Sequence, residues 1–304
     1  MHLTKFLYPT GNYIISNDAK SILSGPGILE HLDKIITTKI IGCENNEIHD
    51  SIICNSNGRI LDQLKIYILD NEAIIINNSI NGSEIRSQLV KGIPWNKKIN
   101  VIDGDDAIIS YRVVGTNITK ILDFIRIDIK ELRGNLWKEY GNMIISMTSG
   151  TGYEILEMLV PIEEKNSMEH IMKECNILKS TIENWDIMRI ELGIVDYLDI
   201  NNSIPFDVKL NHLVKLNKGC YPGQEIHARL ESRGKINNTL VRLRANSNHN
   251  KNKFRIIDGG KIKIKSSYKF NEMVISLGII PKKYENMTSI ETVENIKFLV
   301  EKID

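Results

Sequence analysis

The run Lys218-Gly219-Cys220-Tyr221-Pro222-Gly223-Gln224-Glu225 holds the densest set of chemically able side chains in this chain of 304 residues. A thiol stands between two glycines, and a lysine precedes it by two positions. The thiolate is the reactive form of cysteine, and a nearby cation favours it, so Lys218 is expected to activate Cys220. Gly219 and Gly223 let the main chain turn tightly and leave the thiol approachable. The alternative is an inert cysteine held in a structural turn.

The residues that follow the thiol offer a carboxylate, an imidazole and a guanidinium. Arg229 could pair with a carboxylate of a ligand, because a guanidinium fork matches a carboxylate. An internal ion pair with Glu225 or Glu231 is the equal alternative. Gln224 and Glu225 also suit a structural role, since such side chains satisfy main-chain donors after a tight turn. No second His or Cys stands at metal-ligand spacing from His227, so no protein-bound metal is expected.

The other cysteines, Cys43, Cys54 and Cys175, lie among apolar residues and are expected to be small buried side chains. No Cys-x-x-Cys pair exists, which excludes a zinc ribbon and a thioredoxin-type motif. Few, unpaired cysteines are typical of a reducing compartment. The sequence also lacks the apolar run of a signal peptide and any 18-residue apolar segment, so a cytoplasmic protein with no membrane span is expected.

The charge balance gives no global argument for nucleic acid, because the formal net charge is only +1. From Lys235 onward, however, 14 Lys and Arg stand against 7 Asp and Glu. Such a basic module could meet RNA, an acidic partner or a polyanionic ligand. A solvated, lysine-rich surface is the favoured interpretation.

Hydrophobic periodicity places these residues in an α+β chain with a small C-terminal β-barrel from about residue 238. The Asn55-Ser56-Asn57-Gly58 turn between apolar runs predicts a hairpin, because Gly accepts a positive φ without steric cost. The acidic turn at 103–106 lacks the spacing of a calcium loop and is expected to be a plain turn. Helices are expected at 28–36, 82–92, 118–124 and 167–180, and strands at 52–54, 59–68, 73–77, 97–102, 107–114, 143–147, 155–160, 239–244, 261–265, 273–278 and 298–300.

Four segments resemble one known family, and they occur along the chain in the order that the family has. Residues 218–225 resemble the signature of the YgfZ family, the folate-binding relatives of glycine-cleavage T-protein in the aminomethyltransferase superfamily. Gly58-Arg59-Ile60-Leu61-Asp62, Gly152-Tyr153-Glu154-Ile155 and the Arg-x-Glu-x-Gly segment at 189–193 resemble further motifs of that superfamily. The eight-residue signature is highly specific, the shorter segments are weak alone, and together they span roughly residues 50–235.

This resemblance implies a fold and a role. The implied fold is an α+β ring of three subdomains around a central channel that holds tetrahydrofolate or a one-carbon derivative. Residues 1–235 would form the folate-binding region of two intertwined subdomains, the middle one at about 50–130, and residues 236–304 the barrel. The implied role is support of iron–sulfur cluster assembly or repair, and so of tRNA-modifying iron–sulfur enzymes, with Cys220 essential.

The resemblance also implies site residues. Glu154 suits the pterin ring, since a carboxylate accepts two hydrogen bonds from an aminopyrimidine edge, although a Glu that caps the turn is the alternative. Tyr153 would pack beside the ring, and Asn77 follows its strand where the superfamily has a pterin-contacting Asn. Arg189 either binds folate or pairs with Glu191. The implied folate ligands are Asn77, Tyr153, Glu154, Arg189 and Arg229, and the signature residues that support Cys220 are Lys218, Gly219, Tyr221, Gly223, Gln224 and Glu225.

One departure from the superfamily concerns the reaction. The methylene-transferring T-proteins have Asp-Asp where this chain has Asp62-Gln63, and the second acid is expected to face the folate nitrogen. An amide cannot take or steer a proton as a carboxylate does, which weakens a folate-dependent aminomethyltransferase, although an alignment slip of one residue would restore Asp62. Whether the chain is an enzyme stays open. An RNA-binding scaffold is the third hypothesis, and direct nucleic-acid binding is not expected because no basic patch is interleaved with aromatic residues. The expected partners are folate and iron–sulfur assembly proteins or client enzymes.

Overall fold

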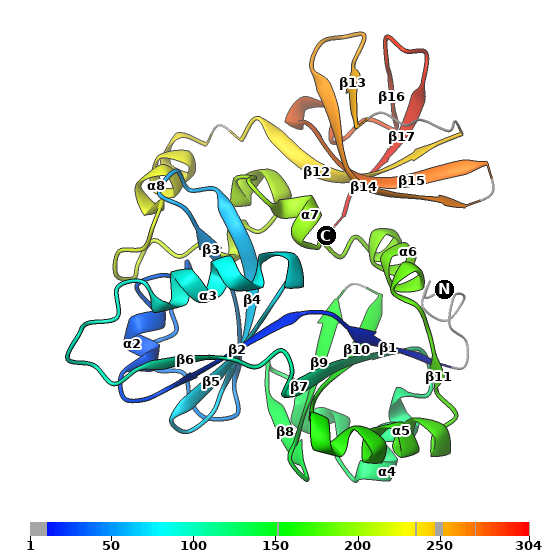
Figure 1. Cartoon of the computed structure of the whole chain (residues 1–304). Coiled ribbons are helices and arrows are strands. Elements are labelled where there is room, and N and C mark those ends of the chain that lie inside the picture. The colour runs from blue at the N-terminus through cyan, green and yellow to red at the C-terminus, as the bar shows by residue number, and fades with distance from the viewer. Residues whose placement is uncertain (1–10, 151, 235, 247–251, 271, 304) are drawn as a thin grey trace. The chain divides into compact units, whose positions relative to one another are not determined.

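The structure is a computed structural model that describes residues 11–150, 152–234, 236–246, 252–270 and 272–303 (Figure 1). Main-chain contacts divide the chain into two compact units. Unit 1 comprises Met1–Ile53 and Asp62–Trp185, and unit 2 comprises Cys54–Leu61 and Asp186–Asp304. A domain boundary near residue 235, and a ring of three subdomains, stay predictions.

Unit 1 contains a five-stranded sheet in the order β3-β4-β5-β2-β6. The strand pairs β4–β5, β5–β2 and β2–β6 are antiparallel, and the strands predicted at 52–54, 59–68 and 73–77 form the meander β3-β4-β5. The elements of this part are β2 (Ala19–Ser24), α2 (Ile28–Leu32), β3 (Ile48–Cys54), β4 (Ile60–Ile68), β5 (Glu72–Asn77), η1 (Ser79–Asn81), α3 (Gly82–Val90) and β6 (Asn100–Asp103).

A second sheet of unit 1 has six strands in the order β11-β1-β7-β10-β9-β8. Helices α4 and α5 lie together on one of its faces (Figure 1), where their apolar residues join strand residues such as Tyr111 and Leu156 in one core. The elements are β1 (Asn12–Ser16), β7 (Ile108–Val114), α4 (Ile118–Ile125), η2 (Ile129–Leu132), β8 (Trp137–Tyr140), β9 (Met143–Gly150), β10 (Tyr153–Pro161), η3 (Ile162–Glu164), α5 (Lys165–Glu174) and β11 (Leu178–Lys179).

The two sheets of unit 1 face each other through a shared apolar core. Tyr67, Ile74 and Ile76 from the first sheet pack with Ile144 and Leu159 from the second. Successive side chains on a strand point to opposite faces, so Gln63, Lys65 and Tyr67 of β4 belong to this face, which we call the inner face. The outer face of the same sheet is covered by α3: a Cβ added at Gly82 would lie 2.8 Å from the Ala19 Cβ.

Unit 2 begins with helices and ends in a β-sheet. Its helical elements are α6 (Ile182–Leu192), α7 (Tyr197–Ile200), η4 (Pro205–Val208), η5 (Asn211–Leu213), α8 (Gln224–Arg233) and η6 (Lys282–Tyr284). Its strands form one sheet in the order β13-β14-β15-β12-β17-β16. They are β12 (Asn238–Ala245), β13 (Lys253–Arg255), β14 (Lys261–Phe270), β15 (Met273–Pro281), β16 (Ser289–Glu291) and β17 (Lys297–Glu301).

The C-terminal sheet is curled, but a closed barrel is not shown. Its ladders end at β13 and β16, and among the described residues a single antiparallel bridge, Ile256 with Thr292, connects the segments that follow these edges. One face packs around Phe254 and Phe298, whose ring centroids are 5.2 Å apart. The mixed helix-and-sheet class is therefore confirmed, and the module is best described as a curled sheet.

Several predicted elements differ from the structure for local reasons. The helix expected at 28–36 ends at Leu32. The helix expected at 167–180 ends at Glu174, because Asn176 adopts a left-handed φ of 60° and the chain continues into β11, parallel to β1. The turn at 103–106 is a plain turn, as expected, and Arg86 forms ion pairs with Asp103 and Asp105.

None of the helices in the described ranges combines the length and apolar character needed to cross a membrane.

Candidate ligand-binding site

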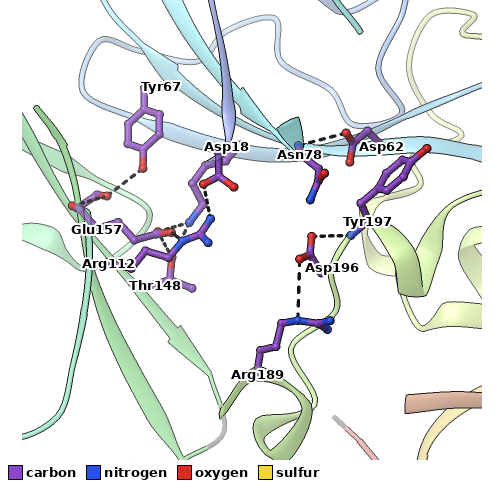
Figure 2. A network of polar contacts seen from close by, with 12 residues as sticks. Asp18, Asp62, Tyr67, Asn78, Arg112, Thr148, Glu157, Arg189, Asp196 and Tyr197 are labelled. Carbon is purple, nitrogen blue, oxygen red and sulfur yellow. Dashed lines mark hydrogen bonds and ion pairs between the residues drawn. The ribbon is translucent and has the colours of Figure 1, made fainter. Parts of the chain in front are cut away.

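Charged side chains stand at one end of the interface between the two sheets of unit 1 (Figure 2). Lys65, on the inner face of β4, donates a hydrogen bond to Thr148 Oγ1 (2.6 Å) and forms an ion pair with Glu157. The Thr148 hydroxyl donates to the same carboxylate at 2.5 Å. The first sheet is thus joined to β9 and β10 of the second by a polar contact that continues the apolar core.

Arg112 of β7 extends this contact. Its guanidinium pairs with Asp18 (2.6 Å), and its Nε lies 3.6 Å from Glu157 Oε1. The Trp185 ring holds the guanidinium from another side, with Cζ 5.0 Å from the ring centroid. We call Asp18, Lys65, Arg112, Thr148 and Glu157 the polar cluster.

The polar cluster is electrically balanced, with two cations and two carboxylates. Burial disfavours the charge of Glu157, but Lys65 and Arg112 outweigh burial and hold the pKa of the carboxyl below its usual value. Burial likewise disfavours the Lys65 ammonium, yet Glu157 raises the pKa of that lysine. Both groups are therefore charged at neutral pH, although their side chains are only 21% and 14% exposed.

Tyr153 adjoins this cluster from the start of β10. Its ring lies over Gly150 on β9, where an added Cβ would come within 2.4 Å of the tyrosine hydroxyl, so a side chain at this position would displace the ring. Burial raises the pKa of Tyr153, with Lys65 and Glu157 both close enough to act on its hydroxyl. Tyr153 and Glu157 are four residues apart on one strand and share a face.

Glu154, predicted to bind the pterin ring, directly follows Tyr153 on β10, so its side chain points to the opposite face of the sheet. Its carboxylate is 43% exposed and pairs with Arg133 at 3.5 Å. Strand alternation therefore separates Glu154 from the polar cluster that lies next to Tyr153.

Asn77 and Asp62 form a separate contact on the outer face of the first sheet. Asn77 is 4% and Asp62 2% exposed. The Asn77 amide donates to Asp62 Oδ2 (3.1 Å), which also accepts the Asn78 main-chain amide (3.2 Å), while Asn77 Oδ1 has no hydrogen-bond partner among the described residues. Figure 2 shows the Asn78 side chain turned away from Asp62.

Gln63 lies on the inner face, with Lys65 and Tyr67, because it is one residue removed from Asp62 on β4. Its main-chain amide donates to Asp62 Oδ1 at 2.8 Å. The two positions of the Asp62-Gln63 pair thus face opposite sides of the sheet. A slip of one residue in alignment would exchange a half-buried amide beside the polar cluster for a buried carboxylate on the helix-covered side.

The signature segment in unit 2 is anchored by two glycines. Gly223, with a φ of 83°, caps α8 and touches the predicted turn at Asn55–Gly58. A Cβ at Gly223 would lie 2.5 Å from the Gly58 Cα and 2.7 Å from the Asn55 main-chain oxygen. Gly58 in turn has a φ of 67° and meets the His227 ring. Gly223 is needed because two main chains meet there, and Gly58 because its φ is left-handed and the His227 ring lies against it.

The aromatic and histidine side chains of this segment, Tyr221 and His227, are structural. His227 is fully buried and its Nε2 donates to the Gly58 carbonyl (2.9 Å), while Tyr221 lies 3.3 Å from His227 Nδ1. His227 is thus a packed histidine. Burial lowers the pKa of His227, and the bond to Gly58 opposes this only in part.

Cys220 stays exposed while its neighbours are packed. Lys218 extends over the Tyr221 ring, with Nζ 5.6 Å from the centroid. Of the other thiols, Cys54 and Cys175 are buried as predicted. Cys43 is not: it is half-buried in a polar loop, 3.7 Å from His49 Nδ1, because the loop leaves the apolar core.

The predicted arginines of unit 2 are paired with carboxylates. Arg229 pairs with Glu225 one turn away, both more than half exposed, as the structural alternative predicted. Arg189 is buried and pairs with Asp199 (2.6 Å) and Asp186 (2.7 Å). The alternative prediction that Arg189 pairs with Glu191 is wrong.

Glu191 instead points toward the C-terminal sheet of the same unit. It binds Arg244 (2.7 Å) and the Tyr268 hydroxyl (2.5 Å). Residues two apart on a helix do not face each other, which explains why Glu191 and Arg189 have different partners.

The structure therefore brings Tyr153 together with a polar cluster in unit 1 and gathers the signature residues around Cys220 in unit 2. Sequence reasoning missed the polar cluster. Its signal was present in β4 and β10, where Lys65 and Glu157 interrupt apolar alternation between buried neighbours. Within the described ranges, no group of three His, Cys, Asp or Glu side chains is arranged to hold a metal ion.

Several known proteins are similar to this chain over most of its length. No family model matches the chain. An aminomethyltransferase of Thermotoga sp. (strain RQ2) is 25% identical over 256 residues, or 77% of this chain and 66% of that protein. A tRNA-modifying protein YgfZ of Blochmanniella pennsylvanica is 22% identical over 249 residues, or 80% of this chain and 74% of that protein. The chain thus spans slightly less than two thirds of the aminomethyltransferase.

A solved structure extends the likeness to nearly the whole chain. The crystal structure of the glycine cleavage system aminomethyltransferase T from Bartonella henselae has a TM-score of 0.82 and 16% identity. The match covers 98% of this chain and 88% of that one. The predicted aminomethyltransferase-type fold is thereby confirmed.

Proposed function

We propose that this chain, which is similar to aminomethyltransferases and to a YgfZ protein, is a cytoplasmic tetrahydrofolate-binding protein that supports the assembly or repair of iron–sulfur clusters. Its clients would include tRNA-modifying iron–sulfur enzymes. The relative named YgfZ is described as tRNA-modifying, which agrees with such a role. Folate binding and the work of the thiol are separate parts of the proposal and rest on different residues.

One observation carries the folate part: a half-buried, charge-balanced polar cluster closes the interface between the sheets of unit 1, with Tyr153 beside it. A pterin ring needs hydrogen-bond partners for its amide and amino edge and an apolar surface for its faces. Gln63 and Asn78 offer amides, Glu157 a carboxylate and Tyr153 a ring. The chemistry of this set therefore fits a reduced pterin.

Of the folate ligands that the resemblance implies, Tyr153 lies beside the polar cluster and is retained in the proposal. Asn77 is buried on the outer face and Glu154 points away from the cluster, so these two, like Arg189 and Arg229 of unit 2, stay predictions. Arg229 is the freer of the two arginines, since an exposed i,i+4 ion pair contributes only a few tenths of a kcal/mol and can be exchanged for a ligand carboxylate. Arg189 is held by two carboxylates, so its contribution would be to position the chain around it. When bound, tetrahydrofolate would supply a one-carbon carrier.

The thiol part depends on Cys220. Its neighbours Tyr221, Gly223 and His227 fix the loop, whereas the thiol itself is exposed. An accessible thiol on a rigid loop suits an exchange with a partner protein better than a buried catalytic step. Lys218, Gly219, Gln224 and Glu225 would support that loop.

A folate-dependent aminomethyltransferase is the second candidate, and Glu157 is the observation that favours it. Gln63 lacks a proton-accepting carboxylate, but Glu157 supplies one on the same side of the sheet, within the polar cluster. The transferase would then lose activity in Glu157→Gln. A Gln63→Ala variant of a transferase that depends on Glu157 would keep most of its turnover.

The test has two arms. In the first, tetrahydrofolate is titrated into the full chain under anaerobic conditions, and saturable binding is expected. In the second, Cys220→Ala is expressed in a host that lacks its own family member, and failure to restore an iron–sulfur enzyme is expected. Cys43→Ala, which removes a half-buried thiol outside the signature, is the matched control and should restore activity.

The outcomes separate the parts of the proposal. Absence of folate binding would remove the folate part, and full rescue by Cys220→Ala would remove the thiol part. Methylene transfer from an aminomethyl donor by the purified chain would favour the transferase.

A further inference from the structure

Four cations share the solvent-facing side of the β13–β14 hairpin in unit 2. Lys253 stands opposite Lys263, and Arg255 stands opposite Lys261. All four side chains are exposed, whereas Phe254 and Ile262 between them are 1% and 0% exposed. Alternation along both strands therefore turns the apolar residues into the core and the cations outward. We call these four residues the basic face.

Both cross-strand pairs of the basic face are repulsive. Like charges directly opposite each other on neighbouring strands destabilise a sheet. No ion pair joins any of the four to a carboxylate among the described residues. Elsewhere the same sheet uses the favourable arrangement, since Glu291 stands opposite Lys297 on β16 and β17.

Protection of a sheet edge accounts for only part of this pattern. β13 is an edge strand, and a charged side chain on an edge prevents pairing with other chains. That protection needs one charge on β13 and would be kept, with better stability, if β14 carried acids. The cations Lys261 and Lys263 on β14 are left without an explanation in the fold itself.

The nearby charges do not cancel the basic face. Asp207 is the carboxyl on whose pKa Lys263 acts, and Arg59 acts on the same carboxyl. Arg59 itself donates to the main-chain oxygen of Asn202 at 2.7 Å, so it adds a further cation to this side of unit 2. Burial raises the pKa of the half-buried Asp207, and Lys263 and Arg59 oppose that rise only in part.

The exposed side chains of the basic face favour one class of ligand. A protein partner needs apolar or aromatic anchors at the centre of an interface, and the alternate residues of this hairpin are buried. The cations repeat about every 6.6 Å along each strand, and two rows run side by side. Binding to a nucleic-acid backbone is dominated by such contacts between Lys or Arg and phosphates.

We propose that the basic face of the β13–β14 hairpin binds the phosphodiester backbone of nucleic acid without reading its sequence. This goes beyond folate binding and uses none of the residues assigned to it. The formal net charge of +1 does not indicate this site, because only strand register brings the four cations together.

The test measures fluorescence anisotropy of labelled single-stranded RNA and DNA against the full chain at several salt concentrations. Four phosphate contacts predict a slope of about −3 in log K against log salt, and so about 50-fold weaker binding at 200 mM than at 50 mM salt. RNA and DNA of unrelated sequence should bind within a few-fold of each other. Binding that depends on base sequence, or that ignores salt, would overturn the proposal.

A charge-reversed variant separates this role from a structural one. Lys253→Glu combined with Arg255→Glu converts both repulsive pairs into attractive ones, so the melting temperature should rise while nucleic-acid affinity falls at least tenfold. Lys97→Glu combined with Lys98→Glu makes the same change in net charge on an exposed loop of unit 1 and is the control. Equal loss in both variants would show a net-charge effect and overturn the site.

Polyglutamate serves as the competing polyanion. Its binding to the wild-type chain as tightly as RNA, with the same loss in the reversed variant, would assign the face to an acidic polypeptide instead. Failure of the chain to bind any of these polyanions at low salt would also overturn the proposal, while leaving the folate proposal untouched.

Discussion

The polar cluster of unit 1 and the signature segment of unit 2 differ in which of their reactive groups are buried. The polar cluster buries charges and pairs them: Lys65 and Arg112 are held by Glu157 and Asp18. The signature segment buries its aromatic and imidazole groups and leaves its thiol outside. In the first, the polar groups themselves form the surface that a ligand would meet, and in the second most of the motif serves to hold one residue in place.

The comparison changes how the signature is understood. Gly223 and His227 fix α8 against the turn at Asn55–Gly58, so these two residues position the segment and take no part in a reaction. The paired charges Lys65 and Glu157 lie on strands β4 and β10 but outside the motif residues of those strands. Reactive residue types in a sequence therefore indicate where a loop must be rigid as much as where a reaction occurs.

The sharpest test of the anchoring role is Gly223→Ala. The added Cβ would lie 2.5 Å from the Gly58 Cα, and the residue must also keep a φ of 83°. We expect the free energy of unfolding, measured in urea, to fall by about 3 kcal/mol or more. Gly234→Ala at the other end of α8 is the control, since it has a φ of 61° but open space, and should cost about 1 kcal/mol. Equal costs would contradict a role for close packing.

The pairing role of the polar cluster is tested by Glu157→Gln. The change leaves Lys65 and Arg112 half-buried without their shared carboxylate, so a loss of about 3 kcal/mol in urea unfolding is expected. Glu154→Gln, three residues earlier on the same strand, breaks only an exposed pair with Arg133 and should cost less than about 0.5 kcal/mol. If the two variants unfold alike, the cluster is not a buried network.

The pH dependence of the free energy of unfolding tests the burial of His227. Burial lowers the pKa of His227 below its ordinary value of 6.5. As the pH falls below 6.5, His227 binds a proton in the unfolded chain but stays neutral in the folded chain, so the free energy of unfolding decreases. Urea unfolding from about pH 8 to pH 5.5 should show this slope, and His227→Gln should flatten it. An unchanged slope in the variant would place the titration elsewhere.

The smallest expected effect on stability belongs to Cys220. Cys220→Ser should leave the free energy of unfolding within about 0.5 kcal/mol of wild type, because the side chain is exposed. A thiol reagent should modify Cys220 rapidly in the native chain, while the buried Cys54, whose pKa burial raises to about 12, reacts only on unfolding. A fast phase that survives in Cys220→Ser would show that another thiol is accessible.

The elements of the fold were predictable where periodicity is local. The meander β3-β4-β5 and the β9–β10 hairpin follow from alternation and turn residues. Helix α8 was not predicted, because Tyr221-Pro222-Gly223 indicates a turn and the following residues are mostly charged. Helix α5 ends early for a reason, the left-handed Asn176, that periodicity does not contain.

The site was predictable only in part. Tyr153 and the signature followed from resemblance, but the Lys65–Glu157 pair joins residues 92 positions apart, and no spacing rule connects them. The outer-face location of Asn77 and Asp62 likewise depends on strand register. The same holds for the basic face, whose opposed cations come from two strands.

The central claim is that the inner face of unit 1 binds a reduced folate, and isothermal titration with tetrahydrofolate tests it most directly. Wild type should bind one equivalent. Gln63→Ala, which removes an inner-face amide without touching the ion pairs, should weaken binding about tenfold, the equivalent of one lost hydrogen bond. Gln88→Ala on the exposed face of α3 should bind as wild type does. Tetrahydrofolate binding that is absent, or that is identical in Gln63→Ala and wild type, would contradict the account.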